Sequence, residues 1–258
     1  FIIQTNLDKA RQALGSLGGG NHFIEIQKGS DGFVWIMVHS GSRNFGYTIA
    51  RVYNDIAKHR CGMWYSNIPN KDLAFLPLED EDGTEYMEAM EYACLFAKVN
   101  RSIILSQVLL AIKDELPAVV EKTYDVSHNY ARLENHFGKN AIVHRKGATS
   151  ARKDEIGIIP GSQGTKSYIV EGLGNVESFT SCSHGAGRAM SRTAARANLI
   201  LVSEVQHLND AGVVHSMTTQ DDLDEAPGAY KDINEVMENQ KDLVKIVVEL
   251  TPMAVVKA

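Results

Sequence analysis

The sequence predicts an α+β fold, with mixed or antiparallel sheets flanked by helices in a single large domain over residues 1–258. Short runs rich in β-branched and aromatic residues are separated by glycine turns, as is typical of strands (22–27, 33–38, 141–144, 156–159 and 167–170). Other segments repeat apolar residues at helical spacing (47–59, 85–116 and 232–250). Helices and strands follow one another without a regular βαβ rhythm, which argues against a doubly wound sheet.

Each element has its own local signal. The first two strands should form a hairpin around the turn at 29–32. The segment 67–83 is expected to be a loop, and 85–116 a long helix or a broken pair that Pro117 closes. The segment 232–250 is predicted to be an amphipathic helix followed by a last strand at 253–256, and 188–200 is also predicted to be helical.

Composition places the chain among ordinary globular proteins. Of its 258 residues 44% are hydrophobic and 22% are charged, and no signal peptide is evident. No apolar run reaches the roughly 20 residues that a membrane span needs, so no membrane partner is expected. Three cysteines without a close pair favour a reducing compartment. We therefore expect a cytoplasmic protein, and because the sequence begins at Phe1, an N-terminal part that precedes it is left open.

The charge is unevenly distributed. The net charge of −6 disfavours a nucleic-acid partner, but residues 141–200 carry eight Lys or Arg against four acids. Residues 201–258 carry eleven acids against four lysines. A local positive surface can bind phosphates on an acidic protein, although scattered solvated charge would give the same count.

The most informative stretch is SCSHGAGRAMSR at residues 181–192. His184 lies among small residues just before Arg188 and Arg192. If 188–200 is helical, His184 lies at a helix N-terminus, where free N–H groups favour an anion. A histidine held against bound phosphate can act as a nucleophile toward phosphorus. The alternative is a surface turn whose histidine caps a helix.

Three further histidines are candidate metal ligands. His22 follows a glycine loop and enters the first strand, and His39 ends the next strand. If these strands pair, both histidines reach the same end of the sheet. His128 would be the third, and three neutral imidazoles suit Mn, Fe, Co, Ni or Zn. A histidine at a strand end is more often structural, and the other five histidines are assigned structural roles.

The loop IPGSQGTKS at 159–167 joins glycines to hydroxyls and a lysine. Its composition resembles that of a phosphate-binding loop. It is not the P-loop, because the G-x-x-x-x-G-K-[ST] spacing is absent.

Taken together, these motifs closely resemble the RtcB family of RNA ligases. The matching stretches are GGGNHFIE (18–25), VHSGSRNFG (38–46), SHNYA (127–131), RKGATSA (145–151), GIIPGSQGTKSYIVEGLGN (157–175), SCSHGAGRAMSR (181–192), AYKDINEVM (229–237) and VVK (255–257). The resemblance implies a GTP- and Mn²⁺-dependent enzyme of RNA repair or tRNA splicing. Such an enzyme joins an RNA 3′-phosphate or 2′,3′-cyclic phosphate to a 5′-hydroxyl, and an accessory activator protein is a further expected partner.

The resemblance also implies roles for individual residues. His184 would become guanylylated, and His22, His39 and His128 would bind manganese, with two ions in the complete protein. Arg43, Arg188 and Arg192 are candidates to hold RNA phosphates. The residues expected around the guanylate are Asn21, His22, Phe23, Ile24, Glu25, His128, Asn129, Pro160, Gly161, Ser162, Gln163, Ser167, His184, Gly185, Ala186, Gly187 and Lys257.

One feature of the family has no counterpart in this sequence. The family takes an aspartate and a cysteine metal ligand from an N-terminal D-x-G-C-like segment, which these residues do not contain. Either that segment belongs to the natural protein and precedes Phe1, or the protein is a truncated form with an incomplete metal site. Two alternatives therefore stay open: a metal-dependent phosphoesterase, and a non-catalytic RNA-binding homologue.

Overall fold

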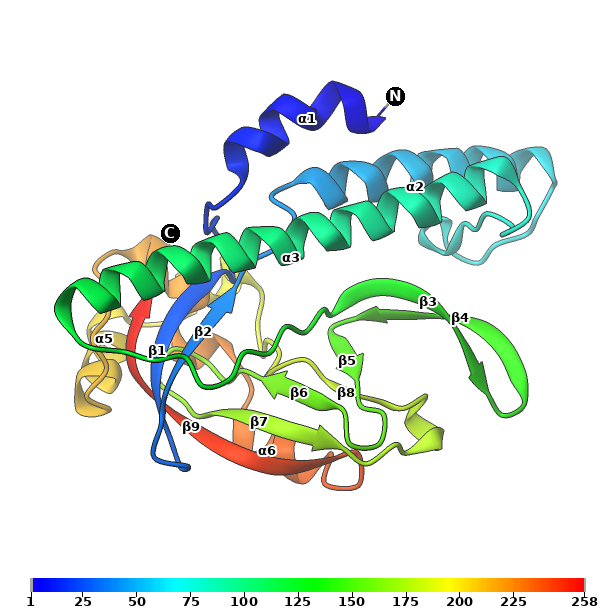
Figure 1. The fold of residues 1–258 in the computed structure, drawn as a ribbon. Helices are drawn as coiled ribbons and strands as arrows, with labels where there is room; N and C mark the ends of the chain where they lie inside the picture. Colours follow the sequence, from blue (N-terminus) through cyan, green and yellow to red (C-terminus); the bar gives the residue numbers. More distant parts are fainter. Residues whose placement is uncertain (1, 258) are drawn as a thin grey trace. The chain divides into compact units, whose positions relative to one another are not determined.

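The computed structural model describes residues 2–257, with side chains from Asp8 onward (Figure 1). The fold is α+β, as predicted. Its residues gather into two compact units. The first unit contains the described residues up to Ser16 together with Ser40–Glu115, and the second contains Leu17–His39 with the described residues from Leu116 onward. Whether they fold as one domain stays a prediction.

The first unit is helical. It contains α1 (Ile2–Ala13), α2 (Phe45–Met63), the short 3₁₀ helix η1 (Lys71–Leu73) and α3 (Glu81–Glu115). Its core joins buried Ala10 of α1 to apolar side chains of α2 and of α3. Asn100, fully buried on α3, donates to Ser40 Oγ at 3.0 Å and accepts from Gly15 N at 2.7 Å. The predicted helix at 85–116 is thus one continuous helix, and the helix at 47–59 is confirmed.

The long helix α3 differs from the expectation that no segment is long and apolar enough to span a membrane. By length and composition alone α3 could do so, with a mean hydropathy of 1.5 in its most apolar stretch. A single helix of this kind is weak grounds for a membrane span.

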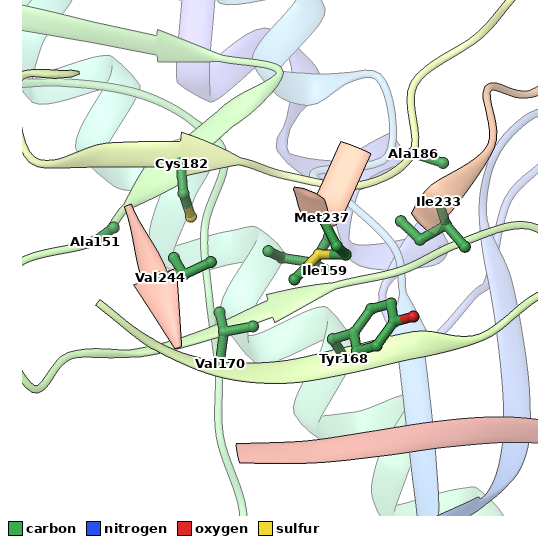
Figure 2. Packing of buried hydrophobic residues seen from close by; sticks show 9 residues of the cluster. All are labelled: Ala151, Ile159, Tyr168, Val170, Cys182, Ala186, Ile233, Met237 and Val244. Carbon is green, nitrogen blue, oxygen red and sulfur yellow. The ribbon is translucent and has the colours of Figure 1, made fainter. Parts of the chain in front are cut away.

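The second unit is built on a five-stranded sheet of order β2-β1-β9-β7-β6 (Figure 1). Its strands are β1 (Phe23–Gly29), β2 (Val34–His39), β6 (Ile156–Ile159), β7 (Ser167–Gly172) and β9 (Val244–Val256), and neighbouring strands run antiparallel. The predicted hairpin at 22–38 is therefore confirmed. One face of β6 and β7 packs Ile159, Tyr168 and Val170 against Met237 and Val244 (Figure 2).

The prediction of a helix over 232–250 is wrong. The helix α6 covers only Ile233–Glu238, and the chain then turns and enters β9 at Val244. The run from Val244 to Val248 is rich in β-branched residues, which fit a pleated surface. Because β9 lies between β1 and β7, its backbone makes hydrogen bonds to a strand on each side. This pairing outweighs the helical spacing of its apolar residues.

Two small two-stranded sheets and short helices complete this unit. One sheet pairs β3 (Asn129–His136) with β4 (Lys139–Lys146), and the other pairs β5 (Ala148–Ser150) with β8 (Ser181–Ser183). The remaining elements are η2 (Val176–Ser178), α4 (Arg192–Asn198), α5 (Leu201–Asp210), η3 (Gln220–Glu225) and η4 (Pro227–Ala229).

The predicted helix at 188–200 is also corrected. Arg188 forms a bridge with Tyr230, and α4 begins at Arg192. Ser191 caps α4 by accepting from Ala194 N, which fixes its start. Gly187 has a φ of 73°, outside the helical region, so the helix cannot extend back toward His184. His184 therefore lies in a loop after β8 and not at a helix N-terminus.

Candidate active site

Four histidines from separate parts of the second unit meet beside the main sheet. The β1–β2 register places Phe23 opposite His39, so His22 and His39 reach the same sheet end, as predicted. His128 immediately precedes β3, and His184 follows β8. Neighbouring rings lie 5.7 Å apart for His22 and His39, 5.3 Å for His39 and His128, and 4.9 Å for His128 and His184. We call these four residues the histidine cluster.

One pair of histidines in the cluster, His39 and His128, has a spacing that suits a shared metal ion. Nε2 of His128 lies 3.2 Å from Nε2 of His39. Two nitrogens bound to one ion at about 2.1 Å each would lie about 3.0–3.4 Å apart at bond angles near 90–110°. Among the described residues, however, no three His, Cys, Asp or Glu side chains stand at the spacing of a finished coordination sphere. The residues fit a shared ion for this pair, and a full ligand set would need further donors or movement of His22.

The electrostatics of the cluster keep the imidazoles of His39 and His184 neutral. Burial, together with smaller effects of the neighbouring histidines and Lys257, lowers the pKa of His39 to about 3. Burial also lowers the pKa of His184, which the nearby backbone of Gly147 opposes only in part. Nδ1 of His184 is buried and makes no well-formed hydrogen bond within the described part of the chain. A neutral imidazole has a lone pair available for a metal or for an electrophile.

A buried carboxyl group lies on β1 beside the cluster. Glu25 is 3% exposed and pairs in register with Val255 of β9, two residues before Lys257. Burial raises its pKa to about 8, although a hydrogen bond from Gln27 and the charge of Lys257 both act in the opposite direction. At neutral pH Glu25 is therefore mainly protonated, and such a carboxyl group can donate as well as accept a hydrogen bond.

The two glycine-containing loops pack against each other. Gly161 N donates to the hydroxyl of buried Ser167 at 3.1 Å, and Ala186 N donates to Pro160 O at 2.9 Å. A Cβ at position 161 would lie 2.2 Å from Lys166 O, so only glycine fits this turn. The loop after Pro160 and the loop after His184 are thus held together, which places the predicted loop residues beside the nucleophile candidate.

The structure shows a feature that the sequence prediction missed. Glu225, at the end of η3, is 3% exposed and lies within reach of three cations. Its carboxylate is 2.8 Å from Arg192 Nε, 3.1 Å from Arg188 Nη1 and 3.7 Å from Lys257 Nζ. It also accepts a hydrogen bond from the hydroxyl of Tyr230. We call Glu225 and these four residues the Glu225 cluster; no sequence motif marked Glu225, because its partners are up to 37 residues away.

The remaining predicted residues have varied positions. Phe23 contacts the ring of His39 edge to face at 5.3 Å. Asn21 and Asn129 are exposed, and Gln163 is buried with its amide donating to Glu225 O at 2.8 Å. Arg43 belongs to the first unit, where its Nε donates to Ser16 Oγ at 3.1 Å. The roles predicted for these residues toward nucleotide and RNA stay predictions.

Comparison with known proteins identifies close relatives. A family profile described as "tRNA-splicing ligase RtcB" matches residues 2–258. The "RNA-splicing ligase RtcB" of Escherichia coli K12 is 42% identical over 251 residues, which cover 95% of this chain and 61% of the relative. The "tRNA-splicing ligase RtcB" of Pyrobaculum aerophilum is 36% identical over 292 residues, covering 96% and 60%. That of Pyrococcus horikoshii is 34% identical over 298 residues, covering 99% and 34%. The chain thus spans about three fifths of the length of the first two of these relatives.

Proposed function

The chain belongs to the RtcB family, and from this premise we propose that it forms the GTP-using site of an RNA ligase. The enzyme would join an RNA 3′-phosphate or 2′,3′-cyclic phosphate to a 5′-hydroxyl through a GMP–histidine intermediate. The names of its relatives support the ligase class. The observation that carries the proposal is the position of His184, which is neutral, lies in a loop and has its ring 4.9 Å from that of His128.

His184 would act as the nucleophile. Its neutral imidazole attacks the α-phosphorus of GTP, a nitrogen–phosphorus bond forms, and the bond to the β-phosphate oxygen breaks so that pyrophosphate leaves. The burial that lowers the pKa of His184 keeps its lone pair unprotonated at neutral pH.

His22, His39 and His128 would hold manganese, with two ions in the complete protein and further ligands from an N-terminal segment. When bound, manganese neutralises phosphate charge and orients the triphosphate for in-line attack. The 3.2 Å approach of the His39 and His128 nitrogens supports this assignment.

The residues around the cluster would bind the guanylate. A protonated Glu25 can donate a hydrogen bond to a guanine acceptor, and Lys257 lies close enough to lower the pKa of Glu25. The two packed loops, with Gly161 to Gln163 and Gly185 to Gly187, would lie around the phosphates. The peptide N–H groups of Gly161, Ser162, Gly185 and Ala186 donate within the chain and fix the shape of these loops.

The RNA steps follow from the same intermediate. An RNA 3′-phosphate oxygen attacks the phosphorus on His184, so that GMP moves to the RNA and the imidazole is released. The 5′-hydroxyl then attacks the activated 3′-phosphate and GMP leaves; a cyclic end is first hydrolysed to a 3′-phosphate. Arg43, Arg188 and Arg192 would contact RNA phosphates, an accessory activator would assist turnover, and the reaction would take place in the cytoplasm.

The test is a joining assay with the complete protein. One RNA carries a 3′-phosphate and the other a 5′-hydroxyl, and GTP and Mn²⁺ are supplied together or singly. The proposal predicts a joined product only when both are present. A 3′-phosphate that is removed without joining would support a phosphoesterase, and RNA binding without any chemistry would support a non-catalytic homologue. Either result would contradict the ligase proposal.

A further inference from the structure

The β3–β4 hairpin, residues 129–146, has an exposed surface that the proposed chemistry does not use. We call it the β3–β4 arm. It begins at Asn129, directly after His128 of the histidine cluster, and the two strands pair without interruption from Asn129 and Lys146 to His136 and Lys139. Eight residues of antiparallel strand extend about 27 Å at about 3.4 Å per residue. The arm therefore starts at the candidate site and ends well away from it.

The charges of the arm have one sign wherever solvent reaches them. Arg132, Lys139 and Lys146 are exposed. The single acid of the arm, Glu134, is buried and bonded to Arg145 through two contacts of 2.7 and 3.0 Å. An exposed surface that presents only cations attracts a polyanion, even on a protein with a net charge of −6.

The tip of the arm carries an aromatic ring where the backbone disfavours one. Phe137 and Gly138 form the two-residue turn, with φ angles of 53° and 75°. Such turns favour Asn-Gly, because a bulky side chain is strained at positive φ. The Phe137 side chain is nevertheless 63% exposed, so burial does not compensate the strain. An exposed and strained aromatic side chain indicates a functional contact.

A second phenylalanine repeats this combination beside the first. Phe179 follows η2, has a φ of 55° and is 44% exposed. Its ring meets Phe137 edge to face at a centroid distance of 5.6 Å. Exposed aromatic faces next to cations are the two components of single-strand nucleic-acid binding: bases stack on rings while phosphates contact Lys and Arg.

The arm is rigid at its base, which suits a binding surface that positions RNA. Arg145 donates to the Phe179 carbonyl at 2.9 Å and to Ser181 Oγ at 3.0 Å, while its other contacts hold Glu134. The arm thus cannot swing freely about its junction with β5 and β8.

We propose that the β3–β4 arm is a binding surface for single-stranded RNA, separate from the reacting ends, with Phe137 stacking on a base and Arg132, Lys139 and Lys146 contacting the backbone. This inference rests on the proposed RNA ligase function and adds the place where RNA beyond the break is held. At a spacing of about 3.4 Å per stacked nucleotide, the arm spans roughly eight nucleotides. RNA with only a few nucleotides beside the break would not reach its tip.

The experiment compares three variants of the complete protein with the parent. They are Phe137→Asn, the double variant Lys139→Gln with Lys146→Gln, and a control, Lys28→Gln, which alters an exposed lysine on the β1–β2 hairpin. Binding of an unreactive 20-nucleotide single-stranded RNA is measured by fluorescence anisotropy over a range of salt concentrations. Melting temperature and GMP transfer from GTP in the absence of RNA are measured in parallel.

We expect Phe137→Asn to bind this RNA about 5- to 20-fold more weakly, while its melting temperature stays the same or rises because Asn relieves the turn. The double lysine variant should bind more weakly and lower the salt slope by about 1.4, at about 0.7 for each lost phosphate contact. Phe137→Asn should not change binding of a four-nucleotide RNA, because such an RNA does not reach the tip of the arm. Neither variant should change GMP transfer, and Lys28→Gln should behave like the parent.

Parental RNA affinity and salt slope in both arm variants would overturn the proposal, as would a loss of affinity that appears equally with the four-nucleotide RNA. Parental RNA binding would also be the result if a protein partner occupies the arm. Because GMP transfer is measured without RNA, failure of the ligase chemistry would appear separately from failure of the arm.

Discussion

The histidine cluster and the Glu225 cluster lie in the same unit and differ in how they are neutralised. In the Glu225 cluster a buried carboxylate meets two arginines, a lysine and a tyrosine hydroxyl, so the chain supplies both signs of charge. In the histidine cluster the neighbouring basic groups that act on His39 are the other three histidines and Lys257, and all of them lower its pKa. In one cluster cations of the chain compensate the buried carboxylate, and in the other His39 is kept neutral by burial and by its basic neighbours.

This difference separates a supporting structure from a binding site. A buried ion pair that satisfies itself holds its partners in place, and removing one member leaves an uncompensated charge. A neutral imidazole does not have to lose a proton before it binds a cation or an electrophilic phosphorus atom, because its lone pair is already available. We therefore expect substitutions in the histidine cluster to remove function, and substitutions in the Glu225 cluster to reduce stability first.

The largest expected effect is on metal binding. His39→Ala should weaken Mn²⁺ binding by at least about 100-fold, since even the loss of an outer partner costs about 10- to 100-fold. The same variant should keep or slightly raise the melting temperature of the metal-free protein. Electron paramagnetic resonance titration with Mn²⁺ measures the first effect and calorimetry the second. If His39 has only a structural role, the variant should bind Mn²⁺ like the parent and have a lower melting temperature.

The Glu225 cluster should respond in the opposite way. Glu225→Gln should lower the free energy of unfolding by about 3 kcal/mol, the low end of the usual range, because Arg192 still reaches solvent. Urea denaturation measures this change. Asp221→Asn is the matched control, because Asp221 is 88% exposed and contacts only Arg196 at 3.7 Å. A loss of metal binding in Glu225→Gln at parental stability would contradict the division between the clusters.

A third buried pair extends the comparison to pH. The Arg145 guanidinium holds the pKa of Glu134 at about 2, below its usual 4.5. The unfolded state therefore binds more protons than the folded state between these values, so stability falls as the pH drops from about 4.5 to 2. On this account Glu134→Gln removes about 2–3 kcal/mol of that acid dependence. Denaturation curves at pH 2.5 and 6 check it, with Glu177→Gln as control; parallel losses in parent and variant would count against the pairing.

The smallest expected effect concerns Lys257, which belongs to the Glu225 cluster and acts electrostatically on the histidine cluster. Lys257→Met should weaken GTP use by about 10-fold or more, the loss of a charged hydrogen bond worth roughly 1.5–3 kcal/mol. Its effect on the melting temperature should be small, since Glu225 keeps both arginines. Initial rates of GMP transfer at varied GTP give the KM. Unchanged kinetics would assign Lys257 to the Glu225 cluster alone.

Local sequence signals predicted the elements whose contacts are local. The hairpin that brings His22 and His39 together follows from two β-branched runs around a glycine turn. The last part of β9 is the strand predicted at 253–256, but the prediction of a helix over 232–250 is wrong for its first part, because the pairing of β9 with β1 and β7 involves residues more than 70 positions away. The approach of His128 and His184 to the hairpin, and the whole Glu225 cluster, likewise depend on contacts that no spacing encodes.

The most direct test of the central claim is covalent labelling of His184. The complete protein is incubated with Mn²⁺ and GTP labelled at the α-phosphate, without RNA. We expect one GMP per chain, in a bond that is labile to acid and stable to base, as expected of phosphorus on nitrogen. We expect no GMP adduct in His184→Ala, although the variant keeps its fold. An adduct of the same stoichiometry in His184→Ala would contradict the assignment of the nucleophile.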